Sequence, residues 1–282
     1  MGVKKVDKKI LRKVYKRRKA WSRKHDFGYL LIIGGSKEYS GSPAFNALAA
    51  LRAGVDLVTI VSPRRAADII ASFKPDLIVH PINADYLTIE NLDEVLGLLH
   101  KKDAVVIGGG MCRYPEVLEF ISEFLKRVKI PTVIDADAIY AASKILEEIE
   151  GKNFVLTPHT HEFYVLSGKR IGFSVRERVK EVYEFSKRWK LTVLLKGHVD
   201  VISDGKKVAI NNTGTPFMTK GGMGDTLTGV LGAILARNVD PFTATCAAAW
   251  INGKAGELAS KKFGEGTMAS DLIEEIPKVI KL

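Results

Sequence analysis

Three glycines and one aspartate precede an apolar run of helical spacing in the stretch KGGMGDTLTGVLGAI, from Lys220 to Ile234. Backbone N–H groups of Gly221 to Gly224 can point into one concavity at the start of a helix, where the helix dipole favours an anion. Asp225 then has two interpretations. It caps the helix, or, beside a phosphate, it accepts the proton of an attacking hydroxyl.

Glycine and polar residues also follow five short apolar segments elsewhere in the chain. In a parallel sheet, ligands gather at the carboxyl ends of the strands, so we expect these stretches to surround one site together with Asp225. The five stretches are Gly34-Gly35-Ser36, Gly108-Gly109-Gly110, Asp135-Ala136-Asp137, Thr157-Pro158-His159 and Lys196-Gly197-His198.

The elements that would position these residues alternate between short apolar strands and helical patterns, which predicts a mostly parallel sheet covered by helices on both faces. Asp204-Gly205 predicts a hairpin turn. The expected strands are 29–33, 57–61, 77–79, 104–107, 132–134, 154–157 and 192–195, with the hairpin strands at 199–203 and 206–210. The expected helices are 43–53, 64–72, 91–100, 115–127, 138–146, 174–189, 225–237, 241–260 and 270–279.

The positive charge of the chain is concentrated at its beginning. The formal net charge is +11, yet residues 1–25 hold 12 of the 43 Lys and Arg and only one acid, Asp7, so residues 26–282 are neutral overall. The spacing of Ile10, Leu11, Val14, Tyr15 and Trp21 predicts a short amphipathic helix. We therefore expect a basic helical arm over residues 1–25 and a single domain over residues 26–282. The arm packs on the domain or a neighbouring subunit, or it attracts polyanions such as nucleic acid.

Location follows from composition. The longest apolar runs are too short to cross a bilayer, and the basic N-terminus lacks the apolar core of a secretion signal. Cys112 and Cys246 stand far apart and predict free thiols in a reducing compartment. These features predict a cytoplasmic protein without a membrane partner.

No dinucleotide fingerprint G-x-G-x-x-G and no P-loop is present, yet Gly222-Met223-Gly224-Asp225 resembles the anion-hole motif of ribokinase-like proteins. Other motifs narrow the match, which covers about residues 25–280, to the ADP- or ATP-dependent NAD(P)H-hydrate dehydratases. In chain order they are Gly35-Ser36, Gly41-Ser42-Pro43, Ala50-Leu51-Arg52-Ala53-Gly54, Val133-Ile134-Asp135-Ala136-Asp137-Ala138, Leu156-Thr157-Pro158-His159 and Leu195-Lys196-Gly197. The resemblance implies a ribokinase-like three-layer α/β sandwich.

The resemblance also implies residue roles. Asp225 is the catalytic base and contacts the hydrated substrate, NADHX or NADPHX. The co-substrate is ADP or ATP with Mg²⁺ on its phosphates and no direct protein ligand to the metal, and the assembly is a homotetramer. The implied substrate-binding residues are Ser42, Gly110 and His159, and the implied nucleotide-binding residues are Lys196, Gly197, His198, Val199, Asp200, Gly222 and Gly224.

Four parts of the chain depart from the family pattern. The family usually has alanine at Ser42, Gly-Pro-Gly-Leu-Gly in place of residues 108–112, glycine at His161 and asparagine near Thr215. These departures bear on the substrate pocket more than on the reaction.

Several residues keep a second interpretation. His159 binds a loop carbonyl or a ligand, and His159 with His161 forms at most a weak metal pair. Asp135 and Asp137 cap a helix or organise magnesium and water, and Lys220 is a solvated charge or a second cation near the phosphates. For the whole chain, the alternatives are a ribokinase-like kinase of a vitamin-precursor alcohol and a nucleic-acid-binding protein that uses the arm.

Overall fold

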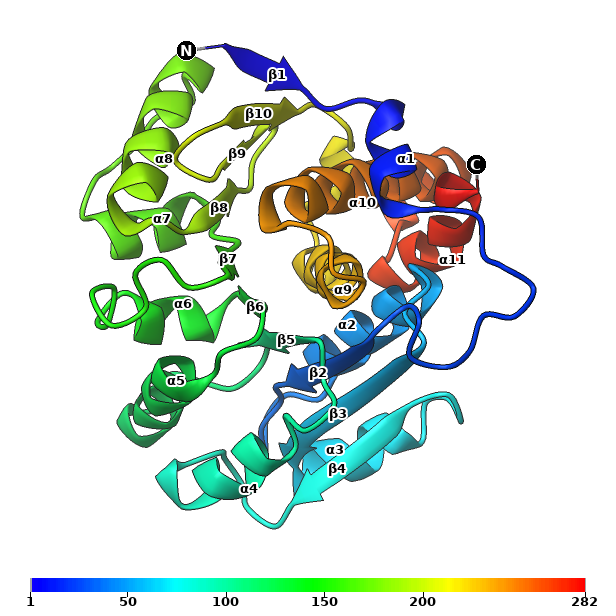
Figure 1. Cartoon of the computed structure of the whole chain (residues 1–282), viewed down its shortest axis with the longest axis vertical. Coiled ribbons are helices and arrows are strands. Elements are labelled where there is room, and N and C mark those ends of the chain that lie inside the picture. The colour runs from blue at the N-terminus through cyan, green and yellow to red at the C-terminus, as the bar shows by residue number, and fades with distance from the viewer. Residues whose placement is uncertain (1, 282) are drawn as a thin grey trace.

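The computed structural model describes residues 2–281, and its centre is one ten-stranded sheet in the order β1-β10-β9-β8-β7-β6-β5-β2-β3-β4 (Figure 1). All neighbouring strands are parallel except the β8–β9 and β9–β10 pairs. The predicted mostly parallel sheet is confirmed. The strands are β1 Val3–Lys5, β2 Tyr29–Ile33, β3 Leu57–Pro63, β4 Ile78–Ile82, β5 Ala104–Ile107, β6 Thr132–Ile134, β7 Phe154–Leu156, β8 Thr192–Leu195, β9 Asp200–Ser203 and β10 Val208–Asn211.

The helices cover both faces of the sheet (Figure 1). On one face lie α1, α2, α3, α9, α10 and α11, and on the other lie α4 to α8. Their bounds are α1 Leu11–Val14, α2 Gly41–Arg52, α3 Arg64–Ala71, α4 Leu92–Gly97, α5 Pro115–Arg127, α6 Asp137–Ala142, α7 Thr160–Ser167, α8 Val175–Trp189, α9 Met223–Ala236, α10 Pro241–Phe263 and α11 Ala269–Ile280.

The central strands are buried on both sides. In β2, Leu30 and Ile32 pack into the core beneath α2 and α9, while Leu31 and Ile33 pack into the core beneath α5. All four side chains are at most 1% exposed. Alternation of side chains across a strand sends neighbours to opposite faces, so a continuous apolar run fills two cores.

Several elements differ from the sequence-based expectation. α4 ends at Gly97 and α6 at Ala142, both earlier than predicted. β4 begins and ends later than predicted and includes Pro81, which the ladder accepts because β4 lies at the sheet edge. α7 lies where the sequence analysis predicts no helix. α9 begins at Met223, two residues before the predicted start at Asp225, because Gly222 in a left-handed conformation forms its N-cap.

Residues 1–25 are tied into the fold more closely than the predicted helical arm. Val3–Lys5 forms strand β1, parallel to β10, and the helix α1 that follows is only four residues long. Leu11 and Val14 are buried against α10 and the rest of that core. The parallel pairing and these buried contacts join two segments far apart in the chain, so the local pattern does not predict them.

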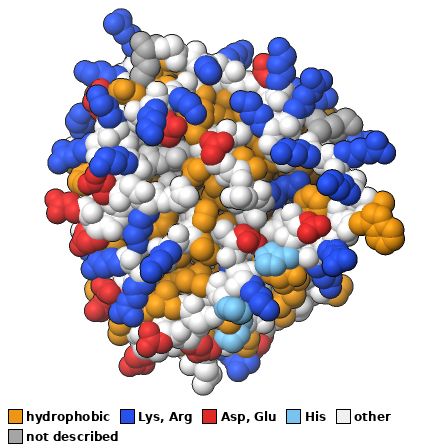
Figure 2. Space-filling view, in the orientation of Figure 1, with side chains coloured by type: hydrophobic (Ala, Val, Ile, Leu, Met, Phe, Trp, Pro, Cys, Tyr) orange, Lys and Arg blue, Asp and Glu red, His pale blue; other side chains and the backbone are white. Residues whose placement is uncertain are grey.

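Most charged groups of this segment remain at the surface. Figure 2 shows Lys and Arg side chains crowding the upper part of the molecule, where β1, α1 and α8 lie in Figure 1. Within residues 2–281, no helix combines the length and the apolar character needed to cross a membrane.

Candidate active site

The first turn of α9 presents backbone donors that the protein leaves open. Gly222 has φ +88°, and a Cβ there would lie 2.8 Å from Ala269 Cβ and 2.9 Å from the Phe45 ring, so only glycine fits. Among the described residues, the N–H groups of Gly224 and Asp225 donate to no acceptor. Open amides at a helix N-terminus form an anion site.

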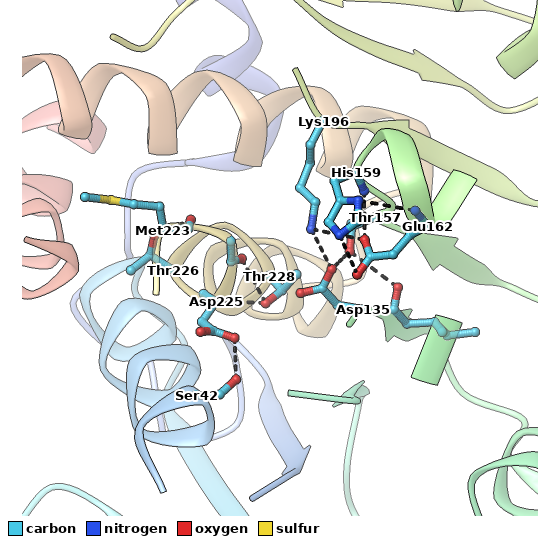
Figure 3. Close-up of polar contacts among 12 residues, drawn as sticks. Ser42, Asp135, Thr157, His159, Glu162, Lys196, Met223, Asp225, Thr226 and Thr228 are labelled. Atoms are coloured by element: carbon cyan, nitrogen blue, oxygen red, sulfur yellow. Dashed lines mark hydrogen bonds and ion pairs between the residues drawn. The ribbon is translucent and has the colours of Figure 1, made fainter. Parts of the chain in front are cut away.

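Asp225 stands in this first turn without capping it. Its Oδ1 accepts a hydrogen bond from Ser42 Oγ at the start of α2 (Figure 3). Asn46 Nδ2 donates to the Asp225 carbonyl at 2.8 Å and holds that turn against α2. Burial raises the pKa of Asp225 to about 6, while the Ser42 hydrogen bond lowers it. Asp225 is thus a half-buried carboxyl that titrates close to neutral pH, as a general base requires.

The glycine loop after β5 lies directly on Ser42 and Asp225. A Cβ at Gly109 would come within 1.9 Å of Ser42 Oγ and 3.2 Å of Asp225 Oδ1. Gly110 has φ +69°, and a Cβ there would lie 3.7 Å from Ser42 Cβ. Three predicted site residues, Ser42, Gly110 and Asp225, therefore meet in space although they come from three separate parts of the chain.

On the other side of α9, Lys196 forms an ion pair with buried Asp135 (Figure 3). Lys196 Nζ and Thr157 Oγ1 each donate to Asp135 Oδ1 at 2.8 Å. A Cβ at Gly224 would lie 3.6 Å from Lys196 Nζ, so this ammonium lies beside the first turn of α9. Burial lowers the pKa of Lys196, but Asp135 and Glu162 outweigh that effect and raise it, so the side chain is a cation.

Glu162 belongs to this cluster and was not singled out from the sequence. It is 5% exposed and lies 4.0 Å from Lys196 Nζ. Burial raises its pKa to about 7, against the opposing charge of Lys196. Glu162 stands three residues after His159, which is the spacing of a capping box. This spacing is the sequence feature that could have identified Glu162.

His159 is the N-cap of α7, so its ring binds backbone N–H groups and not the loop carbonyl of the sequence-based alternative. Its Nδ1 accepts from the backbone N–H groups of His161 and Glu162, and the neutral ring therefore carries its proton on Nε2. The side chain is 53% exposed and Nε2 lies 3.4 Å from Glu162 Oε1. Burial and the charge of Lys196 lower the pKa of His159. Capping leaves Nε2–H available to a ligand.

Hydrogen bonds from Arg178 and to Asp200 fix the loop that begins at Lys196. Arg178 of α8 donates to the Lys196 carbonyl at 2.9 Å, and Asp200 Oδ1 accepts from the Gly197 N–H at 3.0 Å. Burial raises the pKa of Asp200 to about 6. His198 is exposed at the surface and Val199 is half-buried. Arg178 had no recognisable signal in the sequence.

The remaining candidates have structural partners. Asp137 pairs with Arg113, Thr215 Oγ1 lies 3.1 Å from Ser260 Oγ, and Lys220 Nζ donates to the Glu265 carbonyl. Cys112 is half-buried and Cys246 is buried, and both are free thiols. Within the described part of the chain, no cluster of three or more His, Cys, Asp or Glu residues has the arrangement of a metal site.

Comparisons with known proteins agree with this geometry. The model of the NAD(P)H-hydrate dehydratase family matches residues 30–278. A protein of Cenarchaeum symbiosum described as an ADP-dependent (S)-NAD(P)H-hydrate dehydratase is 36% identical over 283 residues, covering 100% of this chain and 98% of that one. The chain belongs to the NAD(P)H-hydrate dehydratase family.

Some relatives of this chain are longer. A bifunctional NAD(P)H-hydrate repair enzyme of Pyrobaculum aerophilum is 43% identical over 94% of this chain, which spans only 52% of that protein. The chain thus spans about half the length of several curated relatives that it matches.

Solved structures of low sequence identity show the same fold. A ribokinase-like superfamily protein of Enterococcus faecalis has a TM-score of 0.84 at 23% identity, with coverage of 99% of this chain and 95% of that one. The ADP/ATP-dependent NAD(P)H-hydrate dehydratase of Bacillus subtilis, co-crystallised with ATP and Mg²⁺, has a TM-score of 0.81 at 24% identity, covering 99% and 98%. The predicted ribokinase-like fold is confirmed.

Proposed function

We propose that this chain dehydrates hydrated NADH and NADPH in a reaction driven by ADP or ATP. One observation carries the proposal. The Asp225 carboxyl, whose pKa burial raises to about 6, lies in the same helical turn as two open backbone amides, and the Lys196 ammonium lies beside that turn at Gly224. A base next to an anion site is the arrangement needed to transfer a phosphoryl group to a hydroxyl. Family membership names the hydroxyl compound as the hydrate of NADH or NADPH.

The proposed chemistry converts a poor leaving group into a good one. Asp225 takes the proton from the hydroxyl at C6 of the hydrated nicotinamide ring, and the hydroxyl oxygen attacks the terminal phosphorus of the nucleotide. The bond from that phosphorus to the nucleotide's bridging oxygen breaks. The lone pair of the ring nitrogen then expels phosphate from C6, and transfer of the C5 proton to water restores the dihydronicotinamide. The chain's tasks are positioning, charge neutralisation and one proton transfer.

Charge neutralisation falls to the groups around the start of α9. The Gly224 and Asp225 amides and the Lys196 ammonium together surround the place where the transferred phosphoryl oxygens become more negative. Gly222 contributes by its backbone conformation. The loop over residues 196–200 is the proposed binding site for the rest of the nucleotide, and a hydrogen bond from Arg178 to the Lys196 carbonyl holds this loop in place.

The site has a place for Mg²⁺ bound to the nucleotide phosphates. Both hydrogen bonds to Asp135 are made at Oδ1, and Figure 3 shows its second oxygen on the α9 side without a partner among the residues drawn. A carboxylate oxygen is a ligand that Mg²⁺ accepts, directly or through water. Bound there, Mg²⁺ would neutralise phosphate charge, and Asp135 is the residue that would hold it.

The substrate would lie across Asp225 with its ring near Ser42 and Gly110. Gly109 and Gly110 pack closely against Ser42 and leave no space for side chains, so the nicotinamide ring would contact the backbone of this glycine loop. His159 Nε2–H is the proposed donor at the other side of the site. We also propose a cytoplasmic location, which suits free thiols and a nicotinamide substrate, and a homotetrameric assembly, which rests on the family resemblance alone.

Direct assay tests the proposal. Purified protein is mixed with acid-hydrated NADH or NADPH, Mg²⁺ and either ADP or ATP, and absorbance of the dihydronicotinamide is followed with released phosphate. We expect both signals to rise together and to require a nucleotide. A protein that restores no dihydronicotinamide with either nucleotide would contradict the proposal, and a stable phosphorylated product without released phosphate would identify a kinase.

A further inference from the structure

Arg113 stands at the edge of the site in a position that the loop packing determines. Gly108 has φ +130°, and a Cβ there would lie 1.9 Å from the Asp135 carbonyl oxygen and 2.7 Å from Ala138 Cβ. The loop after β5 is therefore pressed against the loop between β6 and α6. This contact brings Arg113 next to Asp137 in the first turn of α6.

Two contacts hold the Arg113 side chain in one orientation. Its Nε donates to Asp137 Oδ1 at 2.8 Å, and the other oxygen of Asp137 accepts from the Cys112 N–H at 2.9 Å. The guanidinium carbon lies 4.0 Å from the centre of the Tyr140 ring. An ion pair and a stacked aromatic ring fix the plane of the guanidinium before any ligand arrives.

The two terminal nitrogens of this guanidinium, Nη1 and Nη2, have no hydrogen-bond partner within residues 2–281. Nε makes the bond to Asp137, and neither Nη1 nor Nη2 donates to a described acceptor. The side chain is 56% exposed, whereas Asp137 is 14% exposed. Arg113 follows the site residue Gly110 by three residues, and its partner Asp137 follows the site residue Asp135 by two.

We infer that Nη1 and Nη2 of Arg113 bind the diphosphate bridge of the hydrated dinucleotide substrate. The inference rests on the proposed function, which places the substrate's ring at Asp225 between Gly110 and His159. Arg113 lies on the same loop as Gly110, and its bond to Asp137 holds it at the loop between β6 and α6, which carries Asp135. The first anionic group along the substrate from its ring is the diphosphate bridge. A planar arginine fork matches two oxygens of such a group.

Three variants test the assignment: Arg113→Gln removes the charge, Arg113→Lys keeps it without the fork, and Arg127→Gln is a matched control. Arg127 lies at the end of α5, is 50% exposed and also pairs with carboxylates. Calorimetry measures binding of the products NADH and NADPH, which carry the same diphosphate bridge. Steady-state assays measure kcat and the KM of each hydrate and of ADP, and thermal melting confirms folding.

We expect Arg113→Gln to weaken NADH and NADPH binding equally, by about 10- to 100-fold, the range for losing hydrogen bonds to a charged group. The KM of both hydrates should rise with it, while kcat and the KM of ADP stay unchanged. Arg113→Lys should lose less affinity and Arg127→Gln none.

Three results would overturn the inference while leaving the proposed function intact. The first is unchanged binding of NADH and NADPH in an active Arg113→Gln protein. The second is a loss of affinity confined to NADPH and its hydrate, which would assign Arg113 to the 2′-phosphate. The third is a loss of affinity confined to ADP. A parental protein without dehydratase activity would overturn both proposals.

Discussion

At the scale of single residues, the role of Asp225 decides between a helix cap and a base. Its carboxylate bonds Ser42 rather than the helix amides, so Asp225→Asn should keep the first turn of α9. Asparagine cannot accept the hydroxyl proton, and we expect kcat to fall at least ~100-fold. Nucleotide binding should persist, because the amides and Lys196 remain. Turnover at the parental rate would contradict the assignment and move the search for a base to Glu162.

The same variant carries a stability expectation. Burial raises the pKa of Asp225 from about 3.8 to about 6. The contribution of Asp225 to the free energy of unfolding is therefore fully present below the pKa of about 3.8 and is lost as pH rises through the pKa of about 6. Asparagine does not ionise, so Asp225→Asn should melt at the same or a higher temperature near neutral pH. The matched control is Asp240→Asn, in which asparagine replaces the N-cap of α10 and should leave kcat unchanged.

Ser42 should tune the base rather than serve the chemistry. Its hydrogen bond lowers the pKa of Asp225 against the larger effect of burial, so in Ser42→Ala that pKa should rise. The acid limb of kcat/KM, which falls as Asp225 protonates, should move to higher pH. Activity on the alkaline plateau should stay within about tenfold of the parental value, since the base is retained.

The pH–rate profile of Ser42→Ala is best compared with that of Ser40→Ala. Ser40 precedes α2 and its side chain makes no capping hydrogen bond, so its loss should leave the acid limb in place. Coincident acid limbs in Ser42→Ala and the parental enzyme would show that Ser42 does not influence the ionisation of the base.

At the scale of elements, β1 and α1 act as structural support. Leu11 is fully buried, Tyr15 Oη donates to the Ala53 carbonyl at 3.0 Å, and Arg18 Nη2 donates to the Gly54 carbonyl at 2.8 Å. Leu11→Ala should lower the free energy of unfolding by about 2–5 kcal/mol. Because none of these groups contacts the site residues, kcat of the folded fraction should not change.

Denaturant unfolding and a steady-state assay check the role of this segment. Arg12→Ala, an exposed neighbour in the same helix, should have little effect on stability. Removal of residues 1–20 should destabilise the protein further, because it also strips β1 from β10. Parental stability in Leu11→Ala would show that the segment is a detachable arm, and a loss of kcat in the folded protein would assign it to the active site.

At the scale of the whole molecule, one continuous sheet separates two cores and should unfold with them as a unit. Trp250 is buried in the core beneath α10, Trp189 packs against the opposite core, and Trp21 is 91% exposed. With Trp21 replaced by phenylalanine, variants that keep only Trp189 or only Trp250 report on each core separately. We expect each variant's urea midpoint by fluorescence to coincide with its midpoint by circular dichroism. Separate transitions would contradict the prediction of a single domain over residues 26–282.

Much of this molecule follows from local sequence. Continuous apolar strands predict a sheet covered on both faces, and glycines with polar residues after each strand predict the side on which Asp225, Asp135 and Lys196 meet. These features depend on φ/ψ preferences and on side-chain periodicity, which neighbouring residues determine. Even here α9 begins earlier than predicted, at the left-handed Gly222, and Phe45 and Ala269 occupy the space that a side chain at Gly222 would need.

Only the tertiary structure decided the chemistry of individual groups. Ser42 and Asp225 are 183 residues apart in the chain, and the bond between them has no local signal. Burial raises the pKa of Glu162 to about 7 and that of Asp225 to about 6. Loss of water depends on every element packed around a carboxyl. The sequence by itself therefore determined which residue types stand at the strand ends, and the packing of distant segments determined which of them exchange protons, pair or bind phosphate.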